Sequence, residues 1–198
     1  IRETLTNFMG HRSFTFEPNG HNADILGDNG VGKTTVKSAF LWVFTDKDAE
    51  GKEAEGKGFK LKTLVDGSPI PMIDHSVELV LEEKGKRFTL KKTLKESWVK
   101  TRGTATQEFK GHVNTFEIDG IPKTKKEFDL FISRLCDDSL LRILTDIDYF
   151  PNKMKWEDRR RILLDMCGDI SDADVISSTV TVSNKALNDL LPVLNAGR

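Results

Sequence analysis

The sequence predicts a mixed α/β fold, on three observations made along the chain. A glycine-rich loop at 27–32 stands between a short apolar segment and a helical pattern. A section of alternating apolar and polar residues follows from about residue 77 to residue 118, and a helical last third begins near residue 124. Alternation with a period of two is typical of strands, and apolar residues three and four apart are typical of helices. We therefore expect a strand–loop–helix unit, an antiparallel β meander and a C-terminal helical segment.

Two short strands are expected first, followed by a third that leads into the glycine-rich loop. The first two are indicated by apolar residues on either side of a turn at Gly10, namely Ile1, Leu5, Phe8, Phe14 and Phe16. The third is the apolar segment 23–26, directly before the loop. After the loop, apolar residues at helical spacing form one face of an amphipathic helix: Val36, Ala39, Phe40, Val43 and Phe44. The loop is thus predicted to join a strand to a helix.

The middle of the chain is predicted to hold a loop and then a meander. Residues 45–67 are rich in Asp, Glu, Lys and Gly, so we expect a mobile surface loop that could act as a lid. Alternation at Val77, Leu79 and Leu81 indicates a strand, and the turn at 84–86 makes it one arm of a hairpin. Similar patterns recur at 106–109 and 112–118, before a turn at Asp119-Gly120.

Three helices are expected in the last third. Thr124 and Glu127 have the spacing of a capping box, and an apolar stripe follows them: Phe128, Phe131, Ile132 and Leu135. Further helical segments are predicted at 139–144 and 156–167, the latter ending at Gly168. We expect residues 1–170 to form one lobe and residues 171–198 a helical segment beyond it.

The composition gives no sign of a membrane protein or of a strongly basic nucleic-acid binder. The chain has 30 basic and 31 acidic side chains, for a net charge of -1, so any contact with nucleic acid must be local. No apolar stretch approaches the roughly 20 residues that span a bilayer, and the first residues lack the pattern of a secretion signal. A cytoplasmic protein is expected.

The loop Gly27-Asp28-Asn29-Gly30-Val31-Gly32-Lys33-Thr34 matches the phosphate-binding pattern of Gly, four residues and Gly-Lys-Thr. Glycines allow the backbone N–H groups to turn toward phosphate oxygens, and the helix that follows adds its positive end. We expect Lys33 to contact the β- and γ-phosphates as the catalytic residue and Thr34 to ligate Mg²⁺. The predicted ligand is ATP with Mg²⁺, bound by Asp28, Asn29, Gly30, Val31, Gly32, Lys33, Thr34 and Thr35.

Several segments beyond the loop support a resemblance to a known family. They are Asn7-Phe8, the helical Ala39-Phe40-Leu41-Trp42, and the segments 44–48, 96–98, 101–103 and 156–160. With the loop they resemble the N-terminal ATPase lobe of the SMC, SbcC and RecF group, and most closely phage-encoded SbcC-like ATPases. The resemblance implies a P-loop NTPase fold of the ABC-ATPase-like head type and a role in DNA repair or recombination.

The resemblance also implies partners. In the family an N-terminal and a C-terminal lobe, separated by a long coiled coil, form one head, and two heads enclose two ATP molecules. Neither a Leu-Ser-Gly-Gly signature nor an apolar strand ending in Asp-Glu is found. This lobe is therefore expected to bind ATP better than it hydrolyses it, and 171–198 to lead toward the coiled coil. A homodimer of heads, double-stranded DNA and a nuclease subunit are the implied partners.

At two positions the sequence departs from the family pattern. The basic residue expected after Asn-Phe is replaced by Met9, which leaves Arg12 as the nearest residue to reach the nucleotide. The family's metal-sensing glutamine has no clear counterpart, because Gln107 lies in a predicted strand, and Asp148 or Asn152 is a possible replacement. The histidines show no metal spacing and are assigned no chemistry.

Two basic groups could contact DNA phosphates. One is the run Arg159-Arg160-Arg161, for which a solvated helix face is the simpler interpretation. The other is a stripe across the meander made of Lys84, Lys86, Lys91, Lys92, Lys123, Lys125 and Lys126. For Trp42, Trp98 and Trp156 a packing role is favoured over base stacking.

Three rival functions stay open. A GTPase is disfavoured because 152–155 lacks the aspartate of the guanine-reading Asn-Lys-x-Asp motif. A small-molecule kinase would need a second substrate pocket, and the strand-rich middle argues against it. The third rival is a nucleotide-gated DNA clamp or assembly module whose hydrolysis is incidental.

Overall fold

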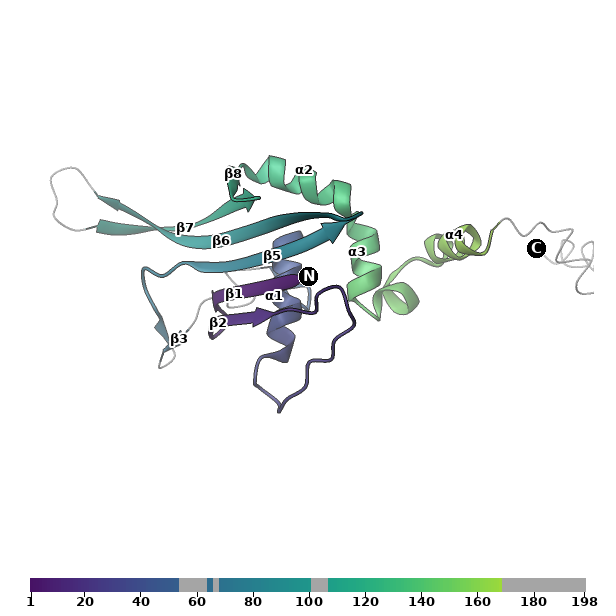
Figure 1. The fold of residues 1–198 in the computed structure, drawn as a ribbon, viewed down its shortest axis with the longest axis horizontal. Coiled ribbons are helices and arrows are strands. Elements are labelled where there is room, and N and C mark those ends of the chain that lie inside the picture. Colours follow the sequence, from purple (N-terminus) through teal and green to yellow (C-terminus); the bar gives the residue numbers. More distant parts are fainter. Residues whose placement is uncertain (54–63, 66–67, 101–106, 169–198) are drawn as a thin grey trace, which may run out of the picture. The chain divides into compact units, whose positions relative to one another are not determined.

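The computed structural model describes residues 1–53, 64–65, 68–100 and 107–168. The chain divides into two units, Ile1–Asp138 and Ser139–Arg198, each of which is described by itself. The first unit contains, in chain order, β1 (Arg2–Phe8), β2 (His11–Phe16), α1 (Lys33–Thr45), β3 (Leu64–Val65), β4 (Ser68–Pro69), β5 (His75–Glu83), β6 (Lys86–Lys100), β7 (Gln107–Ile118), β8 (Ile121–Lys123) and α2 (Lys125–Leu135) (Figure 1).

The first unit is built on an antiparallel sheet of six strands in the order β2-β1-β5-β6-β7-β8. Three of its connections are two-residue turns in which both residues have positive φ: Met9-Gly10, Lys84-Gly85 and Asp119-Gly120. Such turns match the twist of paired strands and set their register. The predicted hairpins and meander are confirmed. Residues 107–109 and 112–118 belong to one long strand, β7, with a bulge opposite Ser97 and Trp98, and residue 106 lies outside the described residues.

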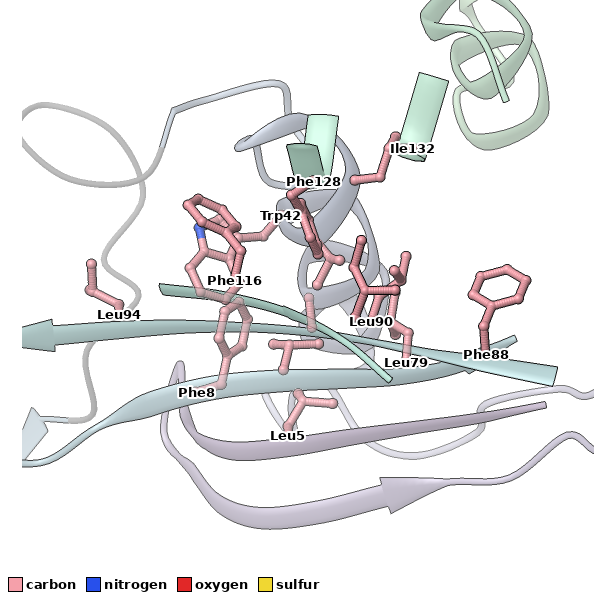
Figure 2. Close-up of a cluster of buried hydrophobic side chains, with 14 residues drawn as sticks. Leu5, Phe8, Trp42, Leu79, Phe88, Leu90, Leu94, Phe116, Phe128 and Ile132 are labelled. Carbon is pink, nitrogen blue, oxygen red and sulfur yellow. The ribbon is translucent and has the colours of Figure 1, made fainter. Parts of the chain in front are cut away.

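Both helices of the first unit pack on the same face of the sheet. One cluster of buried side chains joins Ala39, Trp42 and Val43 of α1, Phe128 and Ile132 of α2, and the inward-facing residues of the strands. Figure 2 shows Trp42 among Phe8, Phe116 and Phe128, each from a different element. The two predicted helical stripes therefore form one core, and the capping box of Thr124 and Glu127 is confirmed.

The strand predicted at 23–26 is wrong. The residues from Ala23 to Leu26 have no strand pairing, and the side chain of Leu26 is 88% exposed. A strand forms only where a neighbouring strand satisfies its backbone hydrogen-bonding groups. No strand in the described part of the chain pairs with this segment, so its apolar residues did not suffice to make it regular.

The loop predicted at 45–67 is ordered where the structure describes it. The Asp48 carboxylate accepts hydrogen bonds from the backbone N–H groups of Glu50 and Lys52 at 2.9 and 2.8 Å, and Ser38 of α1 accepts one from Ala49 at 3.2 Å. Further along, β3 pairs with β4, so residues 64–65 are a short strand. The rest of the predicted lid, residues 54–63 and 66–67, lies outside the described residues.

The second unit contains α3 (Asp138–Thr145), which begins at the boundary, a short π-helix η1 (Tyr149–Lys153) and α4 (Trp156–Cys167). Both α-helices match the predicted segments, and Gly168 follows α4 with a φ of 78°. The π-helix is not predicted by the sequence patterns. The helical segment expected at 171–198 lies outside the described residues, and the division of the chain at residue 170 stays a prediction. Among the helices that the structure describes, none is both long and apolar enough to cross a membrane.

One buried acid predicts a pH dependence of folding. Glu3 on β1 is 6% exposed, its Oε1 atom has no hydrogen-bond partner among the described residues, and burial raises the pKa of its carboxyl from 4.5 to about 8. Because the Glu3 carboxyl keeps its proton to a higher pH in the folded chain than in the unfolded chain, its contribution to stability is complete below pH 4.5 and is lost as the pH rises toward 8. The slope is about 1.4 kcal/mol per pH unit for one group.

We expect the Glu3→Gln variant to lose this slope, since glutamine keeps the shape and does not titrate in this range. Urea unfolding of both proteins at several values between pH 5 and pH 8 measures the difference. Wild type and variant should diverge steadily with pH. Parallel stability curves would show that the Glu3 carboxyl is not protonated in the folded protein.

Candidate functional site

The glycine-rich loop adopts a conformation that depends on its glycines. Gly30 and Gly32 have φ values of 85° and 93°, a region that favours glycine, and Gly32 directly precedes the first residue of α1. The N-terminal end of α1 therefore lies directly at the end of the loop. Helix N-termini present unpaired N–H groups and a partial positive charge, which together attract anions. The predicted combination of glycine loop and helix is confirmed.

Lys33 folds back over the loop. Its Nζ atom donates hydrogen bonds to the carbonyl oxygens of Gly27 and Asp28, both at 2.6 Å. The ammonium group thus lies beside the backbone of the same loop whose N–H groups face a ligand in proteins with this motif. A positive charge held at the start of a helix strengthens the attraction for a polyanion.

The two threonines after Lys33 differ in exposure. Thr34 is exposed at the second position of α1. Thr35 is buried, and its backbone N–H group donates to the Gly32 carbonyl at 3.0 Å. Of these two threonines, Thr34 is thus the one whose hydroxyl is open to a ligand. The other predicted loop residues, Asp28, Asn29 and Val31, are exposed. The roles of all these residues in nucleotide binding stay predictions.

A histidine that sequence reasoning passed over lies against the loop. An ideal Cβ atom placed on Gly32 would come within 2.2 Å of the Nε2 atom of His11, so the imidazole packs directly on the backbone of Gly32. The cause is the tight turn at Met9-Gly10, which pairs His11 with Phe8 at the edge of the sheet. The short spacing between Phe8 and His11 was the one signal that could have identified this residue.

Arg12, the predicted substitute for the family's basic residue, follows His11 on β2 and is exposed. A nucleotide contact by Arg12 stays a prediction. The residue of β2 that the structure brings to the loop is His11.

The predicted lysine stripe does not form one surface. Lys92 is 1% exposed, so it cannot contact DNA, and Lys125 pairs with Asp46 at 2.8 Å and with Asp129 at 3.4 Å. Lys91 lies on the opposite face of β6, between Glu78 of β5 and Glu117 of β7 in the sheet register. Acidic neighbours on both sides offset the charge of Lys91. The stripe is therefore wrong as a continuous basic surface.

In the second unit, two of the three clustered arginines have partners. Arg159 donates to the Pro151 carbonyl, and Arg161 forms an ion pair with Asp158 at 3.0 Å. The two residues proposed to replace the family's glutamine contact each other, because the Asn152 side chain donates to Asp148 at 3.3 Å. Whether either senses a metal stays a prediction.

The three tryptophans differ in environment. Trp42 is completely buried, Trp98 forms an edge-to-face contact with Phe109 at 5.5 Å between ring centroids, and Trp156 is 60% exposed. The favoured packing role is thus confirmed for Trp42. Among the described residues, no group of three or more His, Cys, Asp or Glu side chains could hold a metal ion.

A model of the AAA domain family matches residues 4–190 of the chain, a range that includes the glycine-rich loop, the sheet and the helices of both units. None of the curated proteins matches the chain.

Proposed function

The chain belongs to the AAA domain family, and from that premise we propose that it binds Mg²⁺ and ATP through residues 27–35. Membership of this family supports nucleotide binding and ATPase activity in general. The proposal adds the ligand, the metal and the residues. The observation that supports it best is that the Lys33 ammonium and the positive-φ glycines meet at the N-terminus of α1.

The phosphates and the metal of a bound nucleotide each have a suitable group in the loop or at the start of α1. The N–H groups at the start of α1 suit the phosphates. To reach a phosphate, the Lys33 ammonium needs to give up its hydrogen bonds to the carbonyl oxygens of Gly27 and Asp28. The exposed Thr34 hydroxyl suits Mg²⁺, which prefers oxygen ligands and commonly keeps one or two protein ligands beside phosphate oxygens. The metal, when bound, neutralises phosphate charge.

We further propose that ATP binding serves an SMC- or SbcC-like machine for DNA repair or recombination, with hydrolysis completed by a second lobe and by pairing of two heads. The support for this step is the sequence resemblance. A duplex DNA partner finds no support in the lysine stripe, since Lys92 is buried and Lys91 lies between two glutamates. A nuclease subunit and the homodimer of heads rest on the same resemblance.

The test is calorimetric titration of ATP and GTP into the chain with Mg²⁺, beside the variant Lys33→Ala. Removing the ammonium should weaken ATP binding by about 10- to 150-fold, because hydrogen bonds to charged groups contribute about 1.5–3 kcal/mol. Lys37→Ala is a matched control, since it removes the same charge from an exposed position one turn further along α1.

We expect the Lys37→Ala variant to bind ATP as the wild type does. Equal losses in both variants would mean that the total charge of the helix matters and not a contact by Lys33. Preference for GTP over ATP would overturn the choice of nucleotide, and the absence of binding by the wild-type chain would overturn the proposed site.

A further inference from the structure

Helix α1 links the glycine-rich loop at its N-terminal end to a second polar cluster at its C-terminal end. At its N-terminal end Gly32 contacts His11 of β2, the edge strand, and at its other end Asp46 contacts Lys92 of β6. The helix has 13 residues, which corresponds to about 20 Å of length. One helix therefore spans four neighbouring strands, from β2 to β6.

The cluster at the far end contains a buried charge. The Nζ atom of Lys92 donates to the Trp42 carbonyl at 2.7 Å, forms an ion pair with Asp46, and lies 4.4 Å from the centroid of the Trp42 ring. Burial lowers the pKa of Lys92 to about 8, although Asp46 acts in the opposite direction. A buried charge that loses its partner is strongly destabilising. The position of Asp46 is thus tightly tied to Lys92.

Asp46 also connects α1 to α2. It follows the last residue of α1 with a φ of 61°, and its N–H group donates to the Trp42 carbonyl at 3.2 Å. One of its carboxylate oxygens contacts Lys92, and the other accepts a hydrogen bond from Lys125 at 2.8 Å. Burial alone would raise the pKa of Asp46, but the two lysines hold it below its usual value. The carboxylate is therefore charged and shared between β6 and α2.

Lys125 has a second acceptor within reach. Its Nζ atom lies 3.4 Å from Asp129, one turn further along α2. Lys125 is also the first residue of α2, where a positive charge is unfavourable beside the helix dipole. The capping box of Thr124 and Glu127 keeps this end of α2 regular, so the backbone of Lys125 belongs to the first turn of α2. In the structure Lys125 makes both contacts at once: one bridges α2 to α1 and the other lies within α2.

We propose that the cluster of Asp46, Lys92, Lys125 and Asp129, here called the α1–α2 node, couples nucleotide binding at the loop to the position of α2. This inference rests on the proposed function. A bound phosphate fixes the N-terminal end of α1 and, through the rigid helix, Asp46 at the other end. The Lys125–Asp46 bridge, which the structure contains beside the Lys125–Asp129 pair, then passes this constraint on to α2. Helix α2 is the element that responds.

The experiment is hydrogen exchange of the 198-residue chain with and without Mg²⁺ and ATP, for the wild type, Lys125→Ala and Lys126→Ala. In the wild type, ATP should slow exchange in the loop and, by roughly fivefold or more, in α2, which is the lower end of ordinary allosteric coupling. In Lys125→Ala the loop should still be protected, while the response of α2 is lost. Lys126→Ala removes the neighbouring exposed lysine and should respond as the wild type does.

The outcomes separate this inference from the proposed function. ATP that protects neither the loop nor α2 in the wild type overturns both. Protection of the loop without any response of α2, or an α2 response that survives in Lys125→Ala, overturns the coupling alone. Lys125→Arg should restore the response, because arginine keeps a positive charge within reach of Asp46, and a failure to restore it would also count against the bridge.

Discussion

Replacing Trp42 by alanine is expected to lower the free energy of unfolding by about 3–5 kcal/mol, the range for large aromatic side chains removed from a core. Trp42 is completely buried, and its ring lies 5.5 Å from that of Phe8 between centroids. The same ring faces the buried ammonium of Lys92 at 4.4 Å. The loss is large beside the 5–15 kcal/mol of a typical domain. Urea unfolding followed by circular dichroism measures it.

Two further variants serve as controls for Trp42→Ala. Trp156→Ala removes a tryptophan that is 60% exposed in the second unit and should cost under about 1 kcal/mol. Trp42→Phe keeps a ring in the core and removes an indole N–H that has no hydrogen-bond partner among the described residues, so it should cost less than Trp42→Ala. If Trp42→Ala and Trp156→Ala were equally mild, Trp42 would not be the centre of the core.

Replacing Gly32 by alanine is expected to abolish detectable binding of Mg²⁺ and ATP. Two effects act together: the φ of 93° is unfavourable for any residue with a Cβ atom, and the new methyl group would lie 2.2 Å from Nε2 of His11. The backbone term alone costs about 1–2 kcal/mol. To relieve the clash, either the loop or His11 must move, and a displaced loop no longer presents its N–H groups to the phosphates. Calorimetric titration with ATP is the measurement.

The clash can be separated from the backbone strain. Gly30→Ala is the matched variant, because Gly30 has a similar φ of 85° and no atom within 4 Å of an ideal Cβ position. Gly30→Ala should therefore weaken binding less than Gly32→Ala does. The double variant of Gly32→Ala with His11→Ala should bind ATP more tightly than Gly32→Ala does, because the clash is removed. His11→Ala alone measures the effect of losing the histidine. A double variant that binds ATP as weakly as Gly32→Ala would contradict the steric role of His11.

Much of the fold follows from local patterns. The two-residue turns at Lys84-Gly85 and Asp119-Gly120 have short-range signals, and the capping box at Thr124 is complete within four residues. The failure at 23–26 has the opposite cause, since an apolar segment becomes a strand only if another strand lies beside it. The π-helix at Tyr149–Lys153 likewise has no signal in the apolar pattern.

Local residue patterns were enough to place the glycine-rich loop, the helix after it and the alternation of the meander, because each depends on residues close together in the chain. The tertiary structure alone decided which distant residues meet. It buried Lys92 against Trp42 and Asp46, joined Asp46 to Lys125, and placed His11 on Gly32. These contacts join residues 21 to 79 positions apart, and their partners are set by strand order and by the path of α1 across the sheet, which no local pattern encodes.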